Sequence, residues 1–114
     1  MKPLVLIGAA PCTHQDYAQL KLLGLPEHDI LIVGANVENY EQYNAKYFAT
    51  YHPECLYAMT KRPFIIVSHR QEREMVDVIL PLGEKEPTGS SALLGVLFGI
   101  EEGYDKMILC GCPL

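Results

Sequence analysis

Four short runs of apolar residues, none interrupted by a polar side chain, constrain this chain more than any other feature of its sequence. They are Leu4 to Ile7, Ile30 to Val33, Phe64 to Val67 and Met107 to Cys110. A strand with one solvated face alternates apolar and polar residues, whereas a strand buried on both faces is apolar throughout. Strands that alternate with helical segments form a parallel sheet covered on both sides. The sequence therefore predicts one α/β domain over residues 1–114, a Rossmann-like three-layer fold with a mainly parallel sheet and these runs as adjacent, buried strands.

The segments between the runs predict the remaining elements. Thr13 is a suitable N-cap for a first helix that stops before Gly24 and Pro26, and Gly103 is placed to end a long helix. The other expected elements are a short helix from Asn39 to Phe48, a brief strand from Thr50 to Pro53, a helical turn or two from Glu54 to Lys61, a strand from Val76 to Leu80 and the helix from Ala92 to Glu102.

Charge and composition exclude several classes of function. The net charge is −5 and no basic cluster is longer than Lys61-Arg62, which argues against a nucleic-acid-binding surface but not against a small anionic ligand. The apolar stretch from Ala92 to Ile100 is about half the length of a membrane span, so no membrane partner is expected. The four cysteines lack metal-ligand spacing and are interpreted as free thiols in a reducing cytoplasm. Nothing in the sequence opposes a homo-oligomer.

Small residues lie between the first run and the first helix, at Gly8, Ala9, Ala10 and Pro11. They would let a ligand approach the backbone, and the helix start would offer unpaired N–H groups. A tight turn without a ligand is the alternative. Neither the G-x-G-x-x-G fingerprint nor a phosphate-binding P-loop is present, which disfavours NAD and P-loop ATP binding. Cys12 is expected to have a lowered pKa at this helix start, but no histidine partner is identifiable, so no thiol nucleophile is predicted.

Gly89, Ser90 and Ser91 precede the longest helix and form a candidate anion cradle, with plain N-capping as the alternative. Asn36 follows the second run and is a candidate contact to a base or ribose, or else a turn residue.

His52 follows an apolar segment and is a candidate general acid or base, with a structural histidine as the alternative. Because ligands of parallel α/β sheets bind outside the carboxyl ends of the strands, all these residues are expected to converge at that edge.

Three of these segments together resemble the bacterial CMP-sialic-acid-dependent sialyltransferases and the related 6-hydroxymethylpterin pyrophosphokinase-like proteins, which include phage-encoded members. The resemblance is carried by Leu4 to Pro11, by Gly34-Ala35-Asn36, and by the segment from Ser90-Ser91 to Gly111. It implies that Gly8 to Pro11, Asn36, Ser90 and Ser91 line a site for a CMP-like nucleotide, with the serines toward the phosphate.

The chain also departs from that family. Ala9 stands where the sialyltransferases have an asparagine, and Gly111-Cys112-Pro113 stands where they have Gly-Ile-Asp. The family's lid and catalytic histidine have no counterpart before Leu114. The resemblance thus implies a nucleotide- or nucleotide-sugar-dependent transferase, or an inactive or truncated relative of one. A non-catalytic scaffold or interaction protein of phage-encoded type is the alternative.

Overall fold

The computed structural model describes residues 2–8, 12–34, 43–58, 63–80 and 91–112. Six strands form one sheet in the order β5-β4-β3-β2-β1-β6, and every neighbouring pair is parallel. The strands are β1 (Leu4–Ile7), β2 (Asp29–Val33), β3 (Tyr47–Ala49), β4 (Ile65–Ser68), β5 (Val78–Ile79) and β6 (Met107–Cys110). The helices are α1 (Thr13–Leu22), a 3-10 helix (Pro53–Ala58) and α3 (Ser91–Glu101). The predicted Rossmann-like α/β fold is confirmed.

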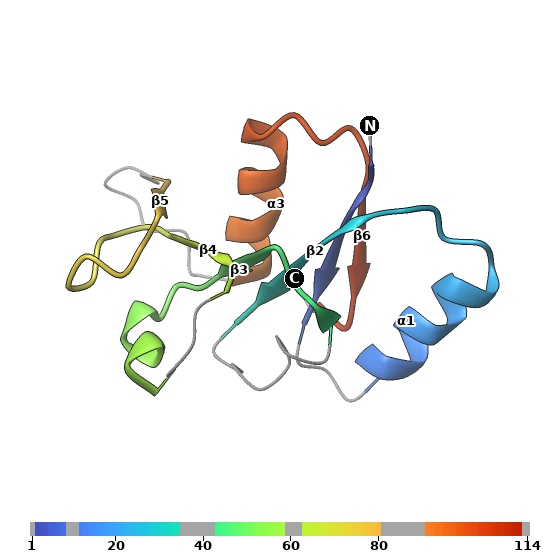
Figure 1. The fold of residues 1–114 in the computed structure, drawn as a ribbon, viewed down its shortest axis with the longest axis horizontal. Coiled ribbons are helices and arrows are strands. Elements are labelled where there is room, and N and C mark those ends of the chain that lie inside the picture. Colours follow the sequence, from blue (N-terminus) through green and yellow to red (C-terminus); the bar gives the residue numbers. More distant parts are fainter. Residues whose placement is uncertain (1, 9–11, 35–42, 59–62, 81–90, 113–114) are drawn as a thin grey trace.

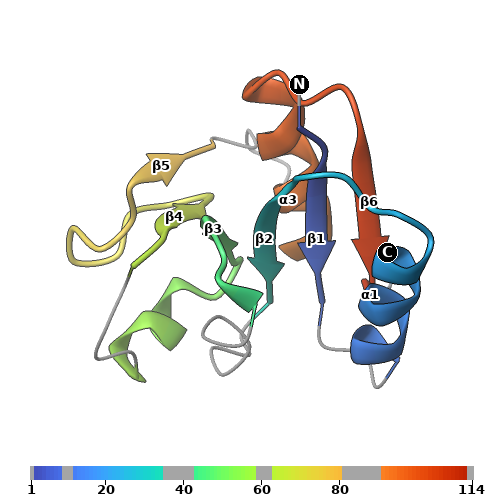
Figure 2. The ribbon, with the colours of Figure 1, turned by 45° about the vertical axis from the view of Figure 1, so that its right-hand side comes forward.

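Alternate residues of the inner strands pack into two separate cores, one on each face of the sheet. On one face, Val5, Ile7 and Ile32 pack with Tyr17 and Leu20 of α1. On the other face, the neighbouring strand residues pack against α3, which lies across β1 to β4. Figures 1 and 2 show α1 and α3 on opposite sides of the sheet. This arrangement explains why the runs Leu4 to Ile7 and Ile30 to Val33 contain no polar residue: both faces of these strands are covered.

The third strand differs from the prediction. The sequence predicts Tyr47 and Phe48 in a helix, followed by a strand from Thr50 to Pro53. In the structure β3 is Tyr47–Ala49, and Pro53 begins the 3-10 helix. The spacing of Tyr43 and Tyr47 mimics a helical face. In the structure, however, Tyr47 to Ala49 pair with Leu31 to Val33 and are fully or almost fully buried. Sheet pairing overrides the local pattern here, and β3 separates β2 from β4.

The burial prediction is correct for β1 and β2, fails at one residue of β4, where Ile65 is 38% exposed, and is wrong for β6. Leu109 is 36% exposed, and Met107 and Ile108 are only half-buried. The residues of β6 are exposed because β6 is the outermost strand on its side of the sheet and pairs only with β1.

Both helices end in the same glycine motif. Gly24 and Gly103 have φ of 86° and 88°, and each donates its N–H three residues back, to Lys21 O and Ile100 O. The residue after each glycine donates its N–H five residues back, to Leu20 O and Gly99 O. These two bonds define a Schellman cap. The prediction that Gly103 ends the long helix is confirmed.

Candidate functional site

Because all strands are parallel, their carboxyl ends lie together at one end of the sheet. We call this end the carboxyl edge and the opposite end, where the strands begin, the amino edge. Figure 2 shows the arrowheads of β1, β2 and β6 at this edge, where α1 also begins. Of the residues predicted to form the site, Gly8, His52 and Ser91 belong to the described part of the chain. Ala9, Ala10, Pro11, Asn36, Gly89 and Ser90 lie outside the described residues.

Gly8 is buried and packs against the end of β6. Its N–H donates to Cys110 O (2.8 Å), and its carbonyl accepts from Thr13 Oγ1 (3.2 Å). A Cβ added at Gly8 would lie 2.0 Å from Gly111 O, and one added at Gly111 would lie 1.9 Å from Thr13 Oγ1. The ends of β1 and β6 are therefore in close main-chain contact where the strand order reverses. That Gly8 contacts a ligand stays a prediction.

Thr13 is the first residue of α1 and not its cap. The N-cap residue is Cys12, which makes no side-chain capping bond. The Thr13 hydroxyl donates to Gly8 O instead, and this bond joins the first turn of α1 to the end of β1.

Ser91 is the first residue of α3, and its hydroxyl acts outside the helix. Ser91 Oγ accepts a hydrogen bond from the N–H of Tyr51 (3.1 Å), in the segment that leaves β3. This bond fixes the start of α3 beside the end of β3. A helix start carries N–H groups without an acceptor in the helix, together with the positive end of the helix dipole.

Two fully buried hydroxyls support this region. Ser68 Oγ, at the end of β4, donates to Thr50 O (2.7 Å). Thr50 Oγ1 accepts from the N–H of His52 (2.9 Å). Buried hydroxyls are costly unless they are hydrogen-bonded, so these bonds hold the chain beyond β3 in place. Neither bond is predictable from the sequence, where the only signal is a single hydroxyl residue at the end of an apolar run.

His52 is exposed, with its ring open to solvent. Its Nδ1 lies 3.4 Å from Glu54 Oε1, and Glu54 Oε2 lies 3.3 Å from Arg70 Nη2. His69 differs, because its Nδ1 is buried and has no hydrogen-bond partner among the described residues. The ring of His69 lies 4.9 Å from the ring of Tyr51. Of these two histidines, His52 is therefore the one whose ring is open to solvent.

The pKa expectation for Cys12 is wrong. Its pKa is raised rather than lowered, because the Sγ donates to the Asp16 carboxylate (3.4 Å) and the negative charge disfavours a thiolate. Burial raises the pKa of Cys112 to about 11. Among the residues that the structure describes, no group of three or more His, Cys, Asp or Glu could hold a metal ion. No helix in those same segments is long and apolar enough to cross a membrane.

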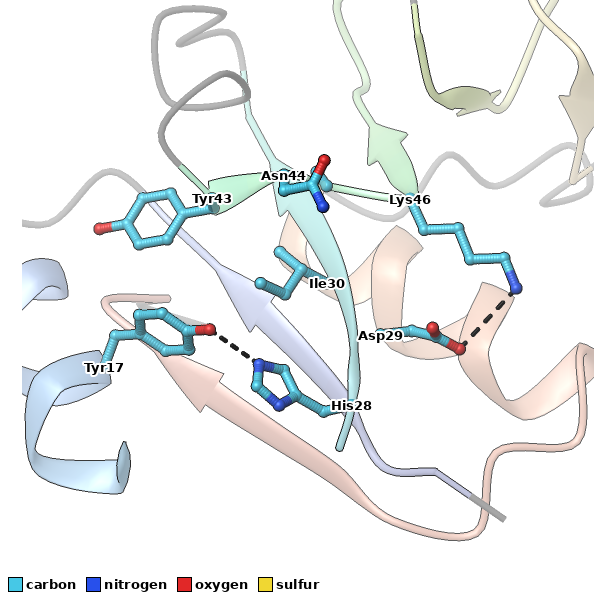
Figure 3. Close-up of a pocket in the computed structure, with 8 residues that line it drawn as sticks. Tyr17, His28, Asp29, Ile30, Tyr43, Asn44 and Lys46 are labelled. Atoms are coloured by element: carbon cyan, nitrogen blue, oxygen red, sulfur yellow. Dashed lines mark hydrogen bonds and ion pairs between the residues drawn. The ribbon is translucent and has the colours of Figure 1, made fainter. Parts of the chain in front are cut away.

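A pocket of about 480 Å³ lies at the opposite, amino edge of the sheet, where the sequence analysis placed no site. Figure 3 shows it between Tyr17 and His28 on one side and Asn44 and Lys46 on the other. The two tyrosines of the pocket, Tyr17 and Tyr43, were assigned to helix faces. The residues that face these tyrosines across the pocket are brought there by the pairing of β2 with β3. That pairing cannot be derived from the local sequence.

Comparison of the chain with protein-family models, with curated proteins and with solved structures finds no match. The fold and the two edges of the sheet are therefore the basis for any functional inference.

Proposed function

We propose that this chain binds the phosphate of a nucleotide or nucleotide-sugar at the carboxyl edge of its sheet, where α3 begins. One observation carries the proposal: the hydrogen bond between Ser91 Oγ and the Tyr51 N–H holds the first turn of α3 at that edge. In parallel α/β sheets this edge is where ligands bind, and a helix start is suited to an anion. By the family resemblance, Gly89, Ser90 and Asn36 would complete the site.

The reaction that fits such a site is group transfer of the sialyltransferase or pyrophosphokinase-like type. The positive end of α3 would stabilise the negative charge that develops on a phosphate leaving group. His52 would serve as general acid or base from the solvent side, since its ring is exposed at the same edge.

A non-catalytic scaffold is the second candidate, and one observation favours it. A Cβ at Gly8 would clash with Gly111 O, and one at Gly111 would clash with Thr13 Oγ1. Main-chain contact between the ends of β1 and β6 thus lies at the point where the strand order reverses, at which ligands of this fold often bind.

A thermal-shift screen with CMP, UMP, AMP, GMP and their sugar conjugates tests the proposal, because a ligand of the folded state raises the melting temperature. The best ligand is then titrated by calorimetry into wild type, Ser91→Asn and Ser91→Asp. Both replacements keep an oxygen that can accept from the Tyr51 N–H, but only Asp adds a negative charge. We expect Ser91→Asp to bind about tenfold or more weakly than Ser91→Asn, since like charges repel. Equal affinities would remove Ser91 from the site, and no binding across the panel would favour the scaffold.

A further inference from the structure

The amino-edge pocket is distinct from the proposed phosphate site, because the two lie at opposite ends of the strands. Its frame is fixed by backbone hydrogen bonds: Lys46 N–H donates to Ile30 O (2.9 Å), and Asp29 N–H donates to Pro3 O (3.1 Å). Ile30 and Tyr43, each only 7% exposed, contribute the small apolar part of a lining that is otherwise polar. A volume of about 480 Å³ lies within the range of roughly 300–1,000 Å³ for small-molecule sites.

One wall of the pocket carries the Tyr17 hydroxyl, which is already hydrogen-bonded to His28. His28 Nδ1 lies 2.9 Å from Pro26 O, and because a carbonyl can only accept, Nδ1 is the donor of this bond. In the tautomer with its proton on Nδ1, His28 Nε2 accepts a hydrogen bond from the Tyr17 hydroxyl (2.8 Å). The Tyr17 oxygen therefore faces any ligand as an acceptor.

The opposite wall presents an amide. Asn44 has a φ of 52°, a left-handed conformation that asparagine adopts more readily than most residues. Figure 3 shows its side chain between Tyr43 and Lys46, across the pocket from His28. The side chain of Asn44 is exposed, and within the described segments no hydrogen bond involves its amide.

The charges at the rim compensate each other. Lys46 Nζ lies 3.8 Å from Asp29 Oδ2, and Figure 3 shows the ammonium directed toward that carboxylate. Such a pair gives the pocket little net attraction for an ion. The neutral groups that line the pocket are then the Tyr17 hydroxyl, the Asn44 amide and a small apolar area at Ile30 and Tyr43.

We propose that this pocket is a binding site for a neutral hydroxylated ligand of the size of one monosaccharide. Its hydroxyls would donate to Tyr17 Oη and pair with the Asn44 amide, while its C–H face would lie against Ile30 and Tyr43. The same chemistry occurs in a free sugar and in the sugar of a nucleoside. This site does not depend on the phosphate site proposed above.

Amide NMR spectra of residues 1–114, recorded during titration with D-glucose, D-ribose, adenosine and inorganic phosphate, test the proposal. We expect D-glucose or D-ribose to shift the amides of Asn44, Ala45 and Lys46 with a Kd of about 1–10 mM, as befits few contacts. Shifts of these amides by adenosine as well would identify a nucleoside sugar as a second source. Phosphate is expected to leave them unmoved.

Two glycine variants make a matched pair. Asn44→Gly removes the amide but accepts the left-handed backbone, so the fold is kept while affinity falls about five- to tenfold, as for one lost hydrogen bond. Glu74→Gly changes an exposed residue with a similar φ of 62° outside the pocket and should bind like wild type. No shift with any sugar, equal affinity in Asn44→Gly, phosphate moving the same amides, or shifts confined to Gly8 and Ser91 would each overturn the proposal.

Discussion

The carboxyl and amino edges of the sheet are held together by different kinds of contact. At the carboxyl edge, main-chain atoms and short side chains are in close contact: Gly8 against Gly111, and Ser91 with the Tyr51 N–H. At the amino edge, long side chains reach one another across strands. Tyr104 Oη donates to Asp29 Oδ2 (2.6 Å), and the Tyr47 and Tyr104 hydroxyls lie 3.1 Å apart.

This difference determines how each edge should respond to change. Where backbones touch, any added atom must displace the main chain, so the cost is steric and independent of pH. Where a half-buried network of phenols holds a carboxylate, the cost is the loss of hydrogen bonds, and it varies with ionisation. The following variants test whether the edges differ in this way.

Gly8→Ala is expected to have the largest effect. Its Cβ would lie 2.0 Å from Gly111 O, and because the obstacle is backbone, we expect a loss of about 3 kcal/mol or more in the free energy of unfolding. Gly24→Ala is the control: its φ of 86° strains alanine, but nothing lies within 4 Å of the added carbon. The control should lose only about 1–2 kcal/mol. Denaturant unfolding measures both, and equal losses would show that the carboxyl edge is not tightly packed.

Tyr104→Phe probes the amino edge. Losing the bond to the Asp29 carboxylate, whose side chain is only 16% exposed, should cost about 1–3 kcal/mol at neutral pH. Burial, followed by the hydrogen bond to Asp29, raises the pKa of Tyr104. A raised pKa in the folded state means that the contribution is full below the unfolded value of about 10 and is lost as pH rises above it.

Unfolding followed from pH 7 to above about pH 10 tests that sign. Wild type should lose stability more steeply than Tyr104→Phe in the alkaline range, so that the two curves approach each other. Ser91→Ala, at the other edge, removes no titrating group and should keep the wild-type slope. Parallel curves for wild type and Tyr104→Phe would contradict the pH-dependent account of the amino edge.

How much of this could be predicted from sequence follows from the same contrast. β1 and β2 were predictable because burial on both faces leaves an unbroken apolar run, and the carboxyl edge followed from the parallel topology. The amino-edge cluster was not predictable, since Asp29 and Lys46 meet only through the pairing of Leu31 with Tyr47. β3 was missed for the same reason: three residues whose local spacing suits a helix become a strand by pairing on both sides.

Ser91→Ala tests the link between α3 and β3. It removes the acceptor of the Tyr51 N–H, and we expect a loss of about 1 kcal/mol. Ser91→Asn keeps an acceptor at the same place and should lose less. Thermal unfolding gives the stabilities, and faster hydrogen exchange of the Tyr51 amide in Ser91→Ala alone would locate the effect. Unchanged exchange would mean that this bond does not hold the two segments together.

The smallest effect concerns Cys12, at the start of α1. A helix start ordinarily lowers the pKa of a thiol, but the Asp16 carboxylate accepts from Cys12 Sγ and raises it. Asp16→Asn removes the charge, so the thiolate fraction near pH 8 should rise and alkylation by iodoacetamide should accelerate about two- to fivefold. Cys110, which is 1% exposed, and Cys112, whose pKa is raised to about 11, should stay unreactive in both proteins. Glu74→Gln removes one negative charge elsewhere and should leave the rate unchanged. A rate that does not respond to Asp16→Asn would mean that the positive end of α1, rather than Asp16, governs this thiol, and the carboxyl edge would then carry a more reactive nucleophile than its hydrogen bonds indicate.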